Sequence, residues 1–144
     1  MLHLDAGNSS SYSGSGNTWN DLSSSGNNGT INGATFNSTN KSFDFDGTND
    51  YVGLSAVLSQ GQSAYTIEGY FKPDTQQTDV IFEQIQAGGG QHTRAAMMTI
   101  GDGYGGFNGW SNDFHDNTPV RISDWNYWTT VSYTHLRAHE TRSD

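Results

Sequence analysis

Apolar and polar residues alternate along several short segments of the chain, and this alternation predicts β-strands. Residues 65–71 show the pattern most clearly. One face of that strand would take Tyr65, Ile67, Gly69 and Phe71, and the other would take Thr66, Glu68 and Tyr70, followed by Lys72. Pro73 should end the strand, because proline has no N–H to donate to a neighbouring strand.

Weaker alternation elsewhere predicts further strands. Leu2 and Leu4 flank His3, and Phe43 and Phe45 flank Asp44, with each pair of apolar residues expected on one face. The other expected strands are residues 51–54, 79–85, 94–100 and 119–122, and one that begins near Trp125. Residues 55–60 could form a single helical turn. Short strands separated by glycine-rich turns indicate an all-β fold, and we expect an antiparallel jelly-roll β-sandwich.

Charge and composition narrow the class of protein. The chain has 144 residues, enough for one domain, and a net charge of −9 from 6 basic and 15 acidic residues. The basic residues form no cluster that could neutralise phosphates, so we expect no nucleic-acid partner and no anionic membrane partner. Disulfides are excluded, because there is no cysteine. No apolar run reaches the roughly 18 residues of a membrane span, and the first residues do not follow a signal-peptide pattern.

The last residues differ from the rest of the chain. The segment VSYTHLRAHET, residues 131–141, resembles the in-frame translation of a sequencing-library adapter. On that reading residues 131–144 are a non-native tail, and the natural domain occupies residues 1–130. The histidines and charged residues of the tail are therefore not assigned to any site.

The stretch SFDFDGTNDYVGL, residues 42–54, allows two readings. The first is a turn between two strands, which accounts for these residues without a metal ion, because Gly47 gives a flexible backbone and Asp50 can accept hydrogen bonds from the turn. The second is a metal loop, which offers the oxygens of Asp46, Asn49 and Asp50 to Ca²⁺. The full calcium-loop pattern with a distant glutamate is absent, so a turn is the first interpretation and a single Ca²⁺ the second.

Four motifs in order resemble those of a known family. They are LDAGN (residues 4–8), TWNDLSSSGNNGTINGATF (18–36), FDFDGTNDYV (43–52) and YTIEGYFKPD (65–74), followed by the tryptophan segment 125–128. Together they resemble a laminin-G-like, concanavalin A-type jelly-roll domain of the kind common in bacterial surface proteins and in phage or marine-virus structural proteins. The resemblance implies several further strands after Trp128, so the domain is expected to be incomplete at its C-terminal end.

The sequence contains few residues in patterns typical of a catalytic site. Glycan hydrolysis needs two carboxylates at a fixed separation, and before the tail the only glutamates are Glu68 and Glu83. Neither belongs to the Glu-x-Asp-x-x-Glu pattern of laminarinase-like glycanases. Glu68 is expected to be a surface carboxylate. Before the tail, His3, His92 and His115 lie in no nucleophile or zinc motif. We therefore expect a protein that is not an enzyme.

The glycine-rich stretch of residues 101–114 contains residue types that are suited to ligand binding. A sugar-binding surface needs aromatic rings to stack on sugar rings and amides or carboxylates to bind hydroxyls. The candidate residues are Tyr104, Phe107, Asn108, Trp110 and Asp113. The alternative is a hairpin whose aromatic residues pack on the sheet.

The sequence as a whole favours a non-catalytic binding module outside the cell, on a cell surface or on a virion. Its expected partner is a glycan or a protein surface. Two alternatives stay open: a glycoside hydrolase or its accessory domain, and a purely structural domain of a phage tail or capsid.

Overall fold

The computed structural model describes residues 1–55, 65–76, 79–85, 94–99, 104–109 and 112–132. These residues form strands, short turns and no helix, so the described part of the chain is all-β with small antiparallel sheets. The chain divides into two compact units, Met1–Val57 and Leu58–Asp144. The arrangement of the strands as a jelly roll, and the domain limits of 1–130 and 131–144, stay predictions.

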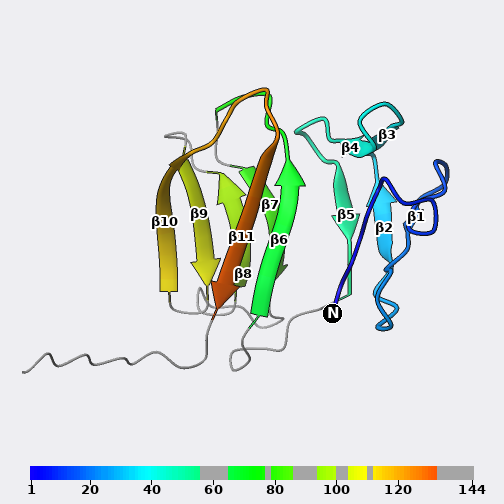
Figure 1. Cartoon of the computed structure of the whole chain (residues 1–144), viewed down its shortest axis with the longest axis horizontal. Coiled ribbons are helices and arrows are strands. Elements are labelled where there is room, and N and C mark those ends of the chain that lie inside the picture. Colours follow the sequence, from blue (N-terminus) through cyan, green and yellow to red (C-terminus); the bar gives the residue numbers. More distant parts are fainter. Residues whose placement is uncertain (56–64, 77–78, 86–93, 100–103, 110–111, 133–144) are drawn as a thin grey trace, which may run out of the picture. The chain divides into compact units, whose positions relative to one another are not determined.

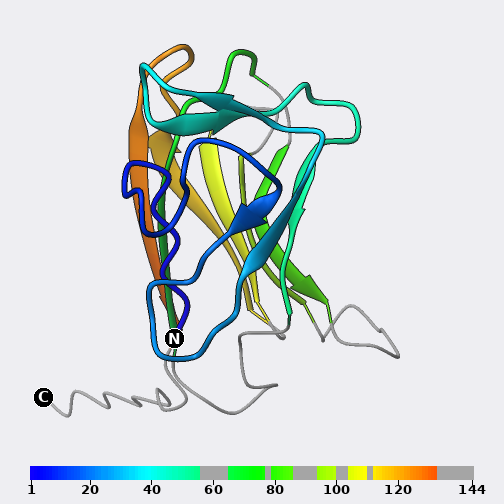
Figure 2. The same cartoon turned by 90° about the vertical axis from the view of Figure 1, so that its right-hand side faces the viewer.

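Unit 1 contains one three-stranded sheet and one hairpin. The sheet has the order β1-β2-β5, from β1 (Thr18–Trp19), β2 (Gly29–Asn32) and β5 (Tyr51–Gly53). The hairpin pairs β3 (Thr35–Asn37) with β4 (Ser42–Asp44). It lies at one end of the three-stranded sheet, as Figures 1 and 2 both show.

Four aromatic side chains form a cluster in unit 1, which also buries Ile31. The ring centroid of Phe43 lies 4.8 Å from that of Tyr12, 4.7 Å from that of Trp19 and 5.6 Å from that of Phe36. Tyr12 is buried, with 6% of its surface exposed. Tilted and edge-on ring pairs of this kind stabilise a core beyond the area they bury. They hold β1, the β3–β4 hairpin and the segment before β1 together.

Phe45 does not share the packing of Phe43, contrary to the expected alternation. The strand β4 ends at Asp44, and Phe45 is 51% exposed. Alternation places side chains on fixed faces only while the backbone stays extended, so it cannot fix a side chain beyond the end of the strand. Similarly, Leu2 and Leu4 are half-buried around an exposed His3, but residues 1–5 form no strand.

The carboxylate of Asp21 organises the first loop of unit 1. Its Oδ1 accepts hydrogen bonds from the backbone N–H of His3 and of Ser23, both at 2.9 Å. Its Oδ2 accepts from the Ser23 hydroxyl at 2.8 Å and from the Asn27 N–H at 3.0 Å. Partial burial acts to raise the pKa of Asp21, but these hydrogen bonds outweigh it and hold the pKa well below the usual carboxyl range.

Unit 2 contains a two-stranded sheet and a four-stranded sheet. The two-stranded sheet pairs β11 (Asn126–Ser132) with β6 (Tyr65–Phe71). The four-stranded sheet has the order β10-β9-β8-β7, and its strands are β7 (Asp79–Ile85), β8 (Arg94–Thr99), β9 (Tyr104–Gly109) and β10 (Asn112–Pro119).

Four strands of unit 2 agree with the expected ones, whereas β9 and β10 were not among the expected strands and form the hairpin that was the alternative for residues 101–114. The strand expected over 94–100 is β8. The strands expected over 65–71 and 79–85 are β6 and β7, and the one expected from Trp125 is β11. The strand expected over 119–122 is wrong, because β10 ends at Pro119 and a turn follows. The helical turn expected over 55–60 lies outside the described residues, apart from Ser55.

Candidate functional site

One face of the β6–β11 sheet is exposed and rich in aromatic residues. Along β6 the residues alternate between half-buried and exposed. In the register of the two strands, Tyr127 lies opposite Tyr70, and Thr129 lies opposite Glu68. We call this surface the aromatic face and define it by the exposed residues of both strands and the residue before β11: Thr66, Glu68, Tyr70, Trp125, Tyr127, Thr129 and Val131.

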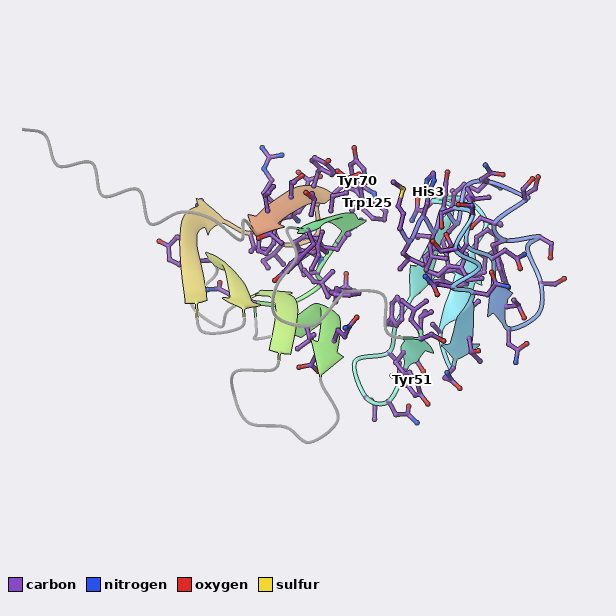
Figure 3. The ribbon with its side chains drawn as sticks, turned by 90° about the horizontal axis from the view of Figure 1, so that it is seen from below. His3, Tyr51, Tyr70 and Trp125 are labelled. Atoms are coloured by element: carbon purple, nitrogen blue, oxygen red, sulfur yellow. The ribbon has the colours of Figure 1, made fainter. Side chains whose placement is uncertain are left out.

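Three large aromatic side chains of this face are open to solvent. Tyr70 is 73% exposed, Tyr127 is 51% exposed and Trp125 is 42% exposed. Tyr70 and Trp125 are labelled in Figure 3, at the same end of the β6–β11 sheet. Single exposed apolar residues are ordinary, but a contiguous group of them is typical of a binding surface.

The two tyrosines and Glu68 form one connected group. The ring centroids of Tyr70 and Tyr127 lie 4.7 Å apart, with 36° between the ring planes. The Tyr127 hydroxyl donates a hydrogen bond to Glu68 Oε2 at 2.8 Å. This bond fixes the carboxylate beside the rings and leaves Glu68 Oε1 without a hydrogen-bond partner among the described residues. The group therefore combines ring faces with an acceptor for a ligand's hydroxyl groups.

The opposite face of the same sheet is packed. Ile67, Phe71 and Trp128 are half-buried there. The rings of Phe71 and Trp128 meet edge to face, with centroids 4.8 Å apart and 81° between the planes. A two-stranded sheet is marginally stable by itself and needs such packing on one face, which leaves the other face to present its exposed side chains.

The turn before β11 sets the position of Trp125. Asn126 is buried, with 7% exposed, and its Nδ2 donates to the carbonyl oxygens of Arg121 and Asp124, both at 2.9 Å. Its Oδ1 accepts from the Arg121 N–H at 3.0 Å. The Ser123 N–H donates to the Pro73 carbonyl oxygen at 2.7 Å, which ties this turn to the residues after β6. Trp125 thus lies between a fixed turn and a paired strand.

The hairpin predicted to bind sugar exists, but its side chains are mostly not described. Strands β9 and β10 pair so that Asn108 lies opposite Asp113, and Phe107 lies opposite Phe114. Tyr104 is 36% exposed. Trp110 and the side chains of Phe107, Asn108 and Asp113 lie outside the described part. The site of Tyr104, Phe107, Asn108, Trp110 and Asp113 stays a prediction.

The 46–50 loop is closed by its own carboxylates. Asp46 Oδ1 accepts hydrogen bonds from the N–H groups of Thr48 at 2.8 Å and Asn49 at 3.3 Å. Asp50 Oδ2 accepts from the Asp46 N–H at 3.0 Å. Asp46 and Asp50 are thereby brought together, and Asn49 lies between them in the chain. Three residues supply fewer than the six to eight oxygens that Ca²⁺ takes, so water would have to complete the shell. A Ca²⁺ ion held by Asp46, Asn49 and Asp50 stays a prediction.

The sequence did not predict the aromatic face as a site, although the exposed residues of one of its two strands were predicted. Thr66, Glu68 and Tyr70 were expected to share one face of β6, and the structure agrees. Trp125 and Tyr127 are two positions apart, but Trp125 precedes β11, so alternation alone does not fix the side on which it lies. What the sequence could not give is the register that brings Tyr127 opposite Tyr70.

Comparison with known proteins assigns no relative to the chain. No family model matches the sequence, and neither the curated proteins nor the solved structures gave a match. Within the part that the structure describes, no helix is long and apolar enough to cross a membrane.

Proposed function

We propose that this protein is a non-catalytic carbohydrate-binding module that holds glycans on the aromatic face of the β6–β11 sheet. The proposal includes a laminin-G-like jelly-roll fold and a place outside the cell, on a cell surface or on a virion. The observation that supports it most is the exposed pair Tyr70 and Tyr127, with Glu68 hydrogen-bonded beside them.

The chemistry of this group suits sugars. A pyranose ring has an apolar face of C–H groups, which packs on an aromatic ring, and a rim of hydroxyl groups, which need hydrogen-bond partners. Tyr70 and Trp125 offer exposed rings, and Glu68 offers Oε1, which has no hydrogen-bond partner among the described residues. Hydrogen bonds to a charged acceptor are stronger than those between neutral groups. The face thus offers both interactions that a sugar needs.

The presence of a single acidic residue in β6 and β11 favours sugar binding over glycan hydrolysis. Glycoside hydrolases generally place two carboxyl groups about 5 to 9.5 Å apart across the bond that they cleave. Glu68 is the one acidic residue in β6 and β11. A single carboxylate can orient a hydroxyl group, but it cannot serve as both acid and nucleophile. A hydrolase or its accessory domain is therefore the weaker alternative.

The test is binding of the full chain to a glycan array, followed by calorimetry on the best ligands. Tyr70→Ala should weaken binding about tenfold or more, which corresponds to the loss of one stacking contact. Tyr51→Ala is the matched control, because Tyr51 is a comparably exposed tyrosine (57%) in unit 1. It should leave binding unchanged.

Other outcomes point elsewhere. Binding that survives Tyr70→Ala but is lost with Trp110→Ala would move the site to the β9–β10 hairpin. An array on which nothing binds would contradict the proposal and favour an architectural domain of a phage tail or capsid.

A further inference from the structure

We infer that the ligand is a linear glycan of several sugar units lying along the strands, and not a single terminal sugar. This inference rests on the proposed function and adds the class of ligand. It is carried by the length and openness of the aromatic face.

The contact positions extend along the whole sheet. Trp125 comes first, the pair Tyr127 and Tyr70 follows, then Thr129 opposite Glu68 and Val131 opposite Thr66. From Trp125 to Val131 the chain advances six residues, which is about 20 Å at the rise of a β-strand. One sugar ring covers only a fraction of that distance. A chain of several units, parallel to β11, could meet each row of side chains in turn.

The openness of the face disfavours a single sugar. Sites for small ligands usually enclose most of the ligand surface. Tyr70, Tyr127 and Trp125 are instead exposed side chains of a sheet face, so the described residues of unit 2 would touch a sugar there from one side. Because each contact is weak and immobilising a ligand has an entropic cost, useful affinity must be added over several linked units.

The rows of side chains along the aromatic face differ in chemistry, which would give a bound glycan a defined position along the sheet. Rings lie at the Trp125 end, and Glu68 with Thr129 offers polar groups in the next row. Lys72, exposed directly after β6, and Glu68 are the charged side chains on this side of β6. Hydroxyl groups of one sugar unit can therefore bind Glu68 while the neighbouring unit stacks on Tyr70.

The experiment compares oligosaccharides of increasing length. Calorimetry would use the cello-, xylo- and laminari-oligosaccharide series from one to six units, together with the corresponding soluble polymers. For the series that binds, affinity should rise by about a hundredfold between the monosaccharide and the hexasaccharide, as two further contacts are added. The rise should flatten once the ligand spans the face.

Trp125→Ala provides the second readout. It should weaken hexasaccharide binding about tenfold and leave disaccharide binding nearly unchanged, because a short ligand can stay on Tyr70 and Tyr127. Tyr51→Ala should change neither. Thermal unfolding of each variant, compared with that of the parent chain, shows whether it is folded.

The outcomes separate the two proposals. If a monosaccharide binds as tightly as the hexasaccharide, or if Trp125→Ala weakens all lengths equally, a linear ligand is ruled out while sugar binding stands. If no sugar of any length or class binds, the proposed function fails as well.

Discussion

The Tyr127 hydroxyl and the Glu68 carboxylate, which lie 59 residues apart in the sequence, are joined by a 2.8 Å hydrogen bond between two strands. Both side chains are exposed, so the bond contributes little to stability. Tyr127→Phe should therefore change the free energy of unfolding by less than about 0.5 kcal/mol. The same variant should weaken glycan binding less than Tyr127→Ala does, since it keeps the ring. Urea unfolding and calorimetry measure the two effects, and equal binding losses for both variants would contradict a stacking role.

The core of unit 1 gives a prediction with an internal control. Phe43 contacts three other rings, whereas Phe45, two residues later, is 51% exposed. Phe43→Ala should lower the free energy of unfolding by about 2–4 kcal/mol, because it removes these contacts and leaves a cavity. Phe45→Ala should change it by no more than about 0.5 kcal/mol. Similar losses in urea unfolding would mean that the aromatic cluster is not the core.

Substitutions at two glycines would distinguish the stability cost of backbone strain from that of steric overlap. Gly33 and Gly47 both have positive φ, of 81° and 72°. A Cβ on Gly33 would overlap the Asp50 carboxylate, whereas a Cβ on Gly47 would meet nothing within 4 Å. Gly47→Ala should cost about 1 kcal/mol of stability from strain alone, and Gly33→Ala more than about 2 kcal/mol. Thermal unfolding checks the order, and a larger loss at Gly47 would show that the two loops do not pack as described.

The depressed pKa of Asp21 predicts acid sensitivity. Its carboxylate is stabilised in the folded chain, so its contribution is fully present above the ordinary carboxyl pKa near 4. The contribution is lost as the pH falls below about 4 towards the lower pKa of the folded state. The stability difference between the parent chain and Asp21→Asn should therefore shrink between about pH 5 and pH 2. Urea unfolding over that range measures it, and a difference that does not vary with pH would be inconsistent with these hydrogen bonds.

Calcium at the 46–50 loop is tested by melting. If Asp46, Asn49 and Asp50 hold the ion, free Ca²⁺ at a hundred times its dissociation constant should stabilise the chain by about 2.7 kcal/mol. Asp46→Asn should lose that gain, while the parent chain in chelator gives the baseline. An unchanged melting temperature across a Ca²⁺ titration would leave the loop as a turn closed by Asp46 and Asp50 alone.

The sequence by itself determined the strands with regular alternation. In β6 a period of two fixed both the bounds, Tyr65–Phe71, and the exposed face with Glu68 and Tyr70. This succeeded because the information is local: neighbouring side chains of an extended backbone must point to opposite faces. Where the backbone leaves that conformation, local pattern misleads, as it did for Phe45 and for residues 119–122. The short strands β1, β2 and β3 were not predicted, since they hold two to four residues among glycine and asparagine. The longer strands β9 and β10 were not among the expected strands either, because glycine and polar residues interrupt the alternation there.

Only the tertiary structure decided which distant residues meet. The partnership of Tyr127 with Tyr70 and Glu68, and the fit of Gly33 beneath Asp50, depend on strand register and loop closure over long stretches of chain. A shift of one residue in the β6–β11 register would move Tyr127 away from Tyr70, yet the sequence alternates in the same way in both cases. The aromatic face is therefore a property of the pairing, whereas its separate residues were already visible in the chain.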